Sequence, residues 1–161
     1  MNDVAIILLG GKRGGFALVD AEDFPALNQF KWTKHPAGYL HATILESGKW
    51  RTVRMHRQIL NAPAGIGIDH RNHCQHDNTR RNLRVATTRQ NSSNRLKWKT
   101  PTSSRFKGVS WDDAEGKWRA RIRVNYRGIN LGRFRDEAQA ARAYNEAARK
   151  QHGEFASLNP V

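Results

Sequence analysis

The clearest pattern of apolar and polar positions lies between Lys117 and Val124, where the two kinds of residue alternate strictly. A period of two predicts a β-strand with one buried face and one exposed face. The buried face is expected to hold Trp118, Ala120, Ile122 and Val124. The opposite face, called the basic face below, holds Lys117, Arg119, Arg121 and Arg123. Because neighbouring like charges repel each other, a strand that simply faces solvent usually mixes signs, so the basic face is expected to meet an anionic partner.

Two further strands and a helix are predicted around this strand. Residues 106–111 and 129–134 have the composition of short strands, and polar turns separate them from the central one. A helix is expected to begin after Asp136, a favourable N-cap residue, and to end at Gly153. Its apolar stripe, at helical spacing, consists of Ala140, Ala141, Tyr144, Ala147 and Ala148. This region therefore predicts a small three-stranded antiparallel sheet packed on one helix, and such a ribbon of strands fits the major groove of double-stranded DNA.

The middle of the chain predicts a second group of short elements that carries candidate chemistry. A short apolar segment ends at Asp69 and His70, residues 82–85 resemble a strand, and residues 87–95 resemble a short helix with a threonine N-cap. Asp69 and Asn91 offer oxygen ligands of the kind that a hard cation such as Mg²⁺ prefers. His70 is the side chain whose ordinary pKa, about 6.5, suits it to take a proton from water at neutral pH.

Charge narrows the choice of partner. The chain has 28 Lys and Arg residues against 14 acidic ones, a net charge of +14. Residues 1–49 are neutral, whereas residues 50–100 contain only Asp69 and Asp77 as acids and carry +9. Residues 101–161 carry the remaining +5. A solvated surface explains a mixture of charges, but a long stretch with two acids favours binding to a polyphosphate such as nucleic acid.

The remaining features concern compartment and domain boundaries. The longest apolar run, residues 4–9, is too short to span a bilayer and lacks the basic flank of a secretory signal. We therefore expect a cytoplasmic protein without a membrane partner, and no obligate protein partner is inferred. Cys74 is the single cysteine, so no disulfide forms within the chain. Residues 91–104 are polar and contain proline, which predicts a linker and a domain boundary near Thr100.

The order of residues in the middle region resembles the HNH nucleases, and in particular their phage homing-endonuclease branch. The matching residues are Asp69-His70, Asp77-Asn78, Arg81-Asn82-Leu83-Arg84 and Asn91, with upstream matches at Ala17–Asp20, Asp23, Lys31-Trp32, Gly38-Tyr39 and Met55-His56-Arg57. The resemblance implies a ββα-metal fold and a DNA endonuclease in the host cytosol if the gene is phage-encoded. It implies that His70 is the general base, that Asn82 braces the loop and orients His70, and that Asp69 and Asn91 hold one divalent cation, Mg²⁺ or Mn²⁺. Where related loops often carry Asn-Gly-Asp, this chain has Asn72-His73-Cys74, so the local turn is expected to differ.

Residues 104–159 resemble the ethylene-response-factor type of DNA-binding domain. The matching residues are Phe106–Val109, Gly116–Ala120, Ile122-Arg123, Leu131-Gly132, Phe134, Ala140-Ala141, Tyr144, Ala147-Ala148, His152-Gly153 and Leu158-Asn159. The resemblance implies DNA contacts from Lys107, Lys117, Arg119, Arg121 and Arg123. Ser110 and Asn130 stand where plant members carry Arg and Trp base contacts, so the DNA target of the plant proteins does not carry over.

Together these patterns predict an α+β protein of two domains. Residues 1–100 would form an HNH nuclease domain, with a core at about 54–96 and an N-terminal β-rich extension, and residues 101–161 a DNA-binding domain. Two other functions stay open: a sequence-specific DNA-binding regulator with a non-catalytic HNH scaffold, and a zinc module at His73, Cys74 and His76. His56 either contacts the scissile region or packs beneath the site.

Overall fold

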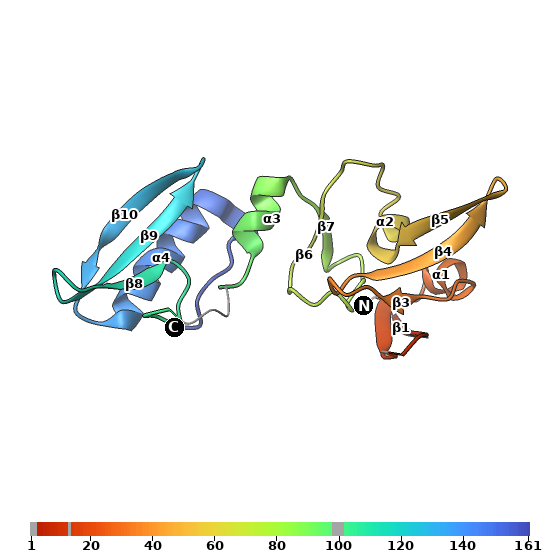
Figure 1. The fold of residues 1–161 in the computed structure, drawn as a ribbon, viewed down its shortest axis with the longest axis horizontal. Coiled ribbons are helices and arrows are strands. Elements are labelled where there is room, and N and C mark those ends of the chain that lie inside the picture. Colours follow the sequence, from red (N-terminus) through yellow and green to blue (C-terminus); the bar gives the residue numbers. More distant parts are fainter. Residues whose placement is uncertain (1–2, 13, 98–101) are drawn as a thin grey trace. The chain divides into compact units, whose positions relative to one another are not determined.

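The computed structural model describes residues 3–12, 14–97 and 102–161. The chain forms two compact units, Met1–Thr88 and Arg89–Val161 (Figure 1). The boundary predicted near Thr100 falls on a residue outside the described residues and stays a prediction. The helical segment just after Thr88 bonds to later residues and is grouped with the second unit. Both units combine short helices with small antiparallel sheets, which confirms the α+β class.

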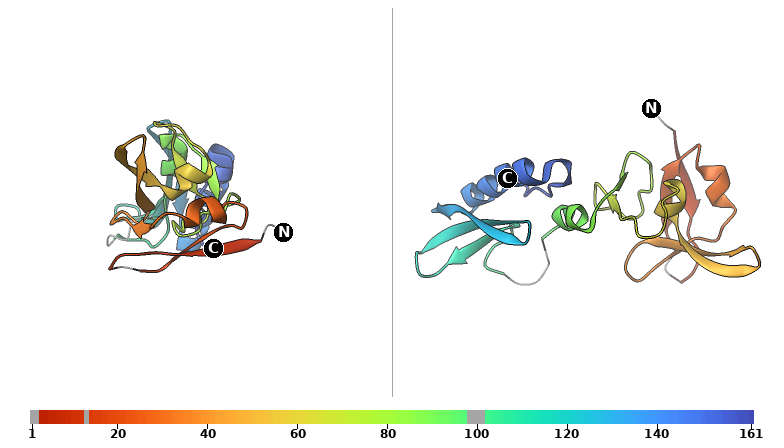
Figure 2. Two further views of the ribbon diagram at one scale, coloured as in Figure 1. Left: turned by 90° about the vertical axis from the view of Figure 1, so that its right-hand side faces the viewer. Right: turned by 90° about the horizontal axis from the view of Figure 1, so that it is seen from above.

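The described residues of the first unit form a three-stranded sheet, two two-stranded sheets and two single-turn helices. Its elements in chain order are β1 (Val4–Leu8), β2 (Phe16–Asp20), α1 (Phe24–Asn28), β3 (Thr33–Lys34), β4 (Leu40–Glu46), β5 (Lys49–Arg54), α2 (Met55–Ile59), β6 (Ile68–His70) and β7 (Leu83–Val85). The strands pair antiparallel as β1–β2, β3–β4–β5 and β6–β7 (Figures 1 and 2). Ser47 and Gly48, which join β4 to β5, both have positive φ, as a two-residue hairpin turn with the right twist requires.

One apolar core holds these elements together. Trp32 is fully buried, and its indole nitrogen donates a hydrogen bond of 2.8 Å to the carbonyl oxygen of Leu27. Val19, Leu40 and Met55 join it from β2, β4 and α2. Leu83 of β7 belongs to the same cluster. The β6–β7 hairpin, where the candidate chemistry lies, is therefore anchored to the core of the N-terminal extension.

The second unit is a three-stranded antiparallel sheet with one long helix along it. It contains α3 (Thr88–Asn94), β8 (Val109–Asp112), β9 (Lys117–Val124), β10 (Arg127–Phe134), α4 (Glu137–His152) and a 3₁₀ turn (Gly153–Phe155). The strand order is β10–β9–β8, and α4 lies along one face of this sheet (Figure 2, right). The helix limits follow the predicted caps, since the Asp136 side chain accepts a hydrogen bond from the Gln139 amide and Gly153 has a φ of 53°.

The predicted alternation in β9 is confirmed. Ala120 and Ile122 are buried against the small and aromatic side chains of α4, whereas Arg121 and Arg123 are exposed. Strand β8 begins at Val109, later than the sequence suggests, because Gly108 adopts a φ of 75° under the ring of Tyr144. Within the described residues, no helix is both long and apolar enough to cross a membrane.

Candidate active site

Asp69 and His70 close strand β6, opposite two residues of β7. Asp69 pairs with Arg84 and His70 with Leu83 in the antiparallel register. Both side chains are buried, with exposed fractions of 6% and 9%. Because successive residues of a strand point to opposite faces, the hairpin presents the carboxylate and the imidazole on different sides.

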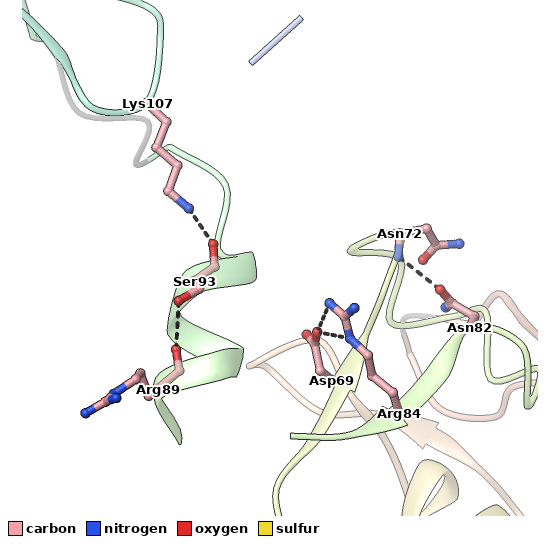
Figure 3. A network of polar contacts seen from close by, with 7 residues as sticks. All are labelled: Asp69, Asn72, Asn82, Arg84, Arg89, Ser93 and Lys107. Carbon is pink, nitrogen blue, oxygen red and sulfur yellow. Dashed lines mark hydrogen bonds and ion pairs between the residues drawn. The ribbon is translucent and has the colours of Figure 1, made fainter. Parts of the chain in front are cut away.

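The carboxylate of Asp69 is held by Arg84. Arg84 donates from Nε and Nη2 to the same Asp69 oxygen, at 2.9 and 2.6 Å (Figure 3). Both side chains are only 6% exposed. Removing one partner of such a buried pair typically costs about 3–5 kcal/mol, since the other charge is left uncompensated. Arg84 thus balances the buried charge of Asp69 and fixes the direction of its carboxylate, a role that the motif match did not reveal.

The imidazole of His70 is oriented by Asn78. Nε2 of His70 lies 3.3 Å from Oδ1 of Asn78, whose own amide nitrogen donates to the Gln75 carbonyl oxygen at 3.1 Å. Since this places the accepting oxygen of Asn78 toward His70, a ring that donates to it carries a proton on Nε2. Burial lowers the pKa of His70, although the Asn78 hydrogen bond and the charges of Asp69 and Asp77 oppose that effect. A neutral imidazole is the form that accepts a proton from water.

A second histidine packs against the first. The rings of His56 and His70 meet edge to face, with centroids 5.6 Å apart and planes at 86°. His56 is 8% exposed, and its Nδ1 has no hydrogen-bond partner among the described residues. Burial, helped by the nearby charges of His70, Arg54 and Arg57, lowers the pKa of His56 to about 4. Of the two roles considered for His56, this geometry favours packing beneath His70.

The low pKa of His56 predicts acid sensitivity of the fold. Between pH 6.5 and about 4 the unfolded chain takes up the proton more readily than the folded one, so stability is full above pH 6.5 and falls toward pH 4. A shift of this size is worth on the order of 3 kcal/mol. His56→Phe keeps a ring in place but does not titrate, so its unfolding free energy should vary less across this range. Urea denaturation of both proteins at several pH values tests this, and parallel pH profiles would contradict it.

Asn82 fastens the loop that connects the two strands. Its side-chain oxygen accepts a hydrogen bond of 3.0 Å from the Asn72 amide, and its side-chain nitrogen donates to the Asp77 carbonyl oxygen at 2.6 Å (Figure 3). The loop is also tied to β2, because Leu18 exchanges backbone hydrogen bonds with His76 and Asn78. The local turn carries His73 at a φ of 64°, the left-handed region that a glycine adopts at low cost.

Asn91, the fourth residue of the predicted site, lies on α3. Asp69, His70 and Asn82 are brought together by one hairpin and its loop in the first unit, whereas Asn91 is a half-buried residue of the second unit. Among the described residues, His73, Cys74 and His76 included, no cluster of three or more His, Cys, Asp or Glu side chains is placed to hold a metal ion.

The predicted DNA-binding residues fall into two environments. The basic face lies on β9, where Arg121 and Arg123 are exposed and Lys117 and Arg119 are half-buried. Asp112, which sequence reasoning passed over, accepts a 2.9 Å bond from Arg133 and lies 3.8 Å from Arg119. The hydrogen bond from Arg133 lowers the pKa of Asp112.

Lys107 stands apart from that face. Its ammonium donates to the carbonyl oxygen of Ser93 at 2.7 Å (Figure 3). It also donates to the carbonyl oxygen of Arg95 at 2.6 Å. Burial lowers the pKa of Lys107 to about 8, so the side chain remains mostly charged at neutral pH.

Comparison with known proteins supports the nuclease interpretation. No protein-family model matches the chain. A search of curated proteins finds an uncharacterised HNH endonuclease of Acanthamoeba polyphaga mimivirus that is 34% identical over 164 residues. The alignment covers 98% of this chain and 82% of the viral protein. The viral protein matches this chain along almost the whole of the chain's length, and the structure places Asp69 and His70, both buried, on a β-hairpin. The chain therefore belongs to the HNH endonuclease family.

Proposed function

We propose that this protein is an endonuclease that hydrolyses phosphodiester bonds of double-stranded DNA, with His70 as the general base. The observation that carries the proposal is the buried imidazole of His70, oriented by Asn78 at the end of β6, directly after Asp69 in a chain of the HNH family. The homologous viral protein is named an endonuclease, which favours DNA as the substrate.

The donor atoms fit a divalent cation. Asp69 supplies a carboxylate whose direction Arg84 fixes, and Asn91 supplies an amide oxygen, the ligand types preferred by Mg²⁺ and Mn²⁺. When bound, such an ion supplies positive charge that stabilises the negative charge developing on the phosphate and on the departing oxygen. We propose that Asp69 and Asn91 are ligands of a single ion.

His70, Asn78 and Asn82 each have a separate role in the proposed reaction. His70 takes a proton from water, and the resulting hydroxide attacks phosphorus in line with the bond to the 3′-oxygen. That bond breaks, and the departing 3′-oxygen takes a proton from solvent. Asn78 keeps the proton of the ring on Nε2, and Asn82 holds the loop that carries Asn78. By resemblance to the phage branch, the products carry 5′-phosphate and 3′-hydroxyl ends.

We further propose that the second unit docks on duplex DNA through the basic face. The sheet with α4 on one side leaves the charges of β9 on the other side, as an ethylene-response-factor-like domain requires. Asp112 forms ion pairs with Arg119 and Arg133 on the same sheet and so fixes the direction of their side chains. A nuclease with its own DNA-reading unit suits a homing role, in which one long site is cut.

A cleavage assay tests the proposal. Supercoiled plasmid and host genomic DNA are incubated with the protein and Mg²⁺, with Mn²⁺, and with EDTA. We expect metal-dependent nicking or linearisation, and sequencing of the break ends then gives the target. Specific binding without any cleavage under all metal conditions would favour the alternative, a DNA-binding regulator with a non-catalytic HNH scaffold.

Substitutions at the two proposed ligands should separate their contributions. Asp69→Asn is preferable to alanine here because it keeps a group of the same shape opposite Arg84. We expect Asp69→Asn to lower the cleavage rate and raise the Mg²⁺ concentration required more than Asn91→Ala does, since it removes a charged ligand. Each effect should be at least about tenfold.

Asn82→Ala serves as the comparison, because Asn82 supports the loop and is not a proposed ligand. It should lower the rate without changing the Mg²⁺ dependence. Normal cleavage by Asn91→Ala throughout a Mg²⁺ titration would place the cation elsewhere.

A further inference from the structure

Helix α3 cannot be stable by itself. It spans only seven residues, Thr88–Asn94, and its sequence is polar throughout. Asn94 is its only buried residue. Isolated helices shorter than about 12–15 residues are marginal in water even with favourable sequences. The helix that carries Asn91 must therefore be held in shape by contacts with the rest of its unit.

The ammonium group of Lys107 supplies two of these contacts. Lys107 lies 14 residues beyond Ser93, yet its Nζ donates to the carbonyl oxygens of both Ser93 (Figure 3) and Arg95. The last carbonyl groups of a helix lack partners within the helix, and a cation there also interacts favourably with the helix dipole. Lys107 thus closes the C-terminal end of α3.

Lys107 is itself rigidly mounted. Its backbone amide donates to Oδ1 of Asn159 at 2.6 Å, and its carbonyl oxygen accepts from the Asn159 side chain at 3.0 Å. Asn159 in turn exchanges two hydrogen bonds, of 2.9 and 2.7 Å, with Asn145 of α4. Both asparagines are buried. A continuous hydrogen-bonded path therefore runs from α4, which supports the sheet, through Lys107 to α3.

Two further contacts join the same segments of the second unit. Lys97, just after the helix, donates from Nζ to the Phe106 carbonyl oxygen at 2.8 Å. The hydroxyl of Ser93 lies 3.4 Å from Nδ1 of His152, at the end of α4. The segments on both sides of the linker are thus fastened to each other within the second unit.

We propose that Lys107 is a positioning residue for Asn91. It clamps α3 within the unit that carries the basic face, so the placement of Asn91 depends on this clamp. This role rests on the proposed function, in which Asn91 is a metal ligand. It also replaces the DNA contact that the family resemblance implies for Lys107, because the ammonium is already engaged by two carbonyl oxygens.

The test compares three full-length variants. Lys107→Met keeps the length of the side chain and removes its charge, and Lys107→Arg keeps a cation that can reach the same carbonyl groups. Lys117→Met is the matched control, because it removes the same charge from the basic face. Each protein is examined by amide hydrogen exchange without DNA, by DNA-binding anisotropy at several salt concentrations, and by single-turnover cleavage.

We expect Lys107→Met to speed exchange of the α3 amides by about tenfold or more, since two charge-assisted hydrogen bonds are lost. Its cleavage rate should fall by a similar factor, while its DNA affinity and salt slope stay within twofold of the wild type. Lys107→Arg should restore most of the protection and most of the rate. Lys117→Met should leave α3 protection unchanged and reduce the magnitude of the salt slope by about 0.9.

Two outcomes would overturn the proposal. If Lys107→Met reduced the salt slope as Lys117→Met does and left α3 protected, Lys107 would be a DNA contact. If α3 lost protection but bound DNA was cut at the wild-type rate, the clamp would have no bearing on the reaction. A wild-type protein that cut no DNA would instead overturn the proposed function, and the exchange data would still decide whether Lys107 clamps α3.

Discussion

His70→Ala should abolish measurable cleavage while leaving DNA binding nearly unchanged. The imidazole acts on water and not on phosphate charge, and removal of a general base typically costs about 10²–10⁴-fold in rate. The rate is measured under single-turnover conditions with enzyme in excess, so that product release does not mask the chemical step. Anisotropy with the same DNA measures binding.

The control for this variant is His35→Ala, which removes a histidine that stacks on Tyr39 beside β3 and β4. It should cleave at the wild-type rate. Thermal unfolding of His70→Ala checks that the hairpin still folds, because the buried Asn78 loses its partner there. Equal rates for His70→Ala and the wild type would exclude His70 as the general base.

The second unit was largely predictable from its sequence because its signals are local. Strict alternation specified the two faces of β9, and Asp136 and Gly153 marked the ends of α4. Short-range pattern and turn chemistry determine features of this kind without reference to distant residues.

The partners of the candidate site were not predictable in the same way. Arg84 reaches Asp69 because the hairpin register sets them opposite each other, and Asn78 reaches His70 because the loop folds back. His56 meets His70 only through the packing of α2. The contacts that hold α3 in the second unit likewise come from residues far along the chain, such as Lys107 and His152. These are contacts between segments that are separate in the sequence, and a periodic pattern contains no information about them.

Arg121 and Arg123 should together supply a large part of the affinity for DNA. Both are exposed and form the C-terminal half of the basic face, so they are the positions on β9 best placed to reach phosphates or base edges. Each phosphate contact changes the slope of log K against log salt by about 0.9, so Arg121→Ala with Arg123→Ala should reduce the magnitude of that slope by about 1.8. If one of the two reads a base, its loss should also relax preference at one position of the target, at a cost of about 1–3 kcal/mol. Anisotropy titrations at several salt concentrations, with target and scrambled duplexes, measure both effects.

The matched control removes the same charge from another surface of the same unit. Arg142 and Arg149 are exposed on α4, the helix that packs against the opposite side of the sheet. Arg142→Ala with Arg149→Ala lowers the net charge equally, and it should change the salt slope far less than the β9 pair does if docking occurs through the basic face. Similar slopes for the two double variants would mean that DNA affinity depends only on the net charge of the protein. The sheet would then not be the docking surface. A clear difference between them would attribute the effect to the face of β9, because charge and unit are the same in both proteins.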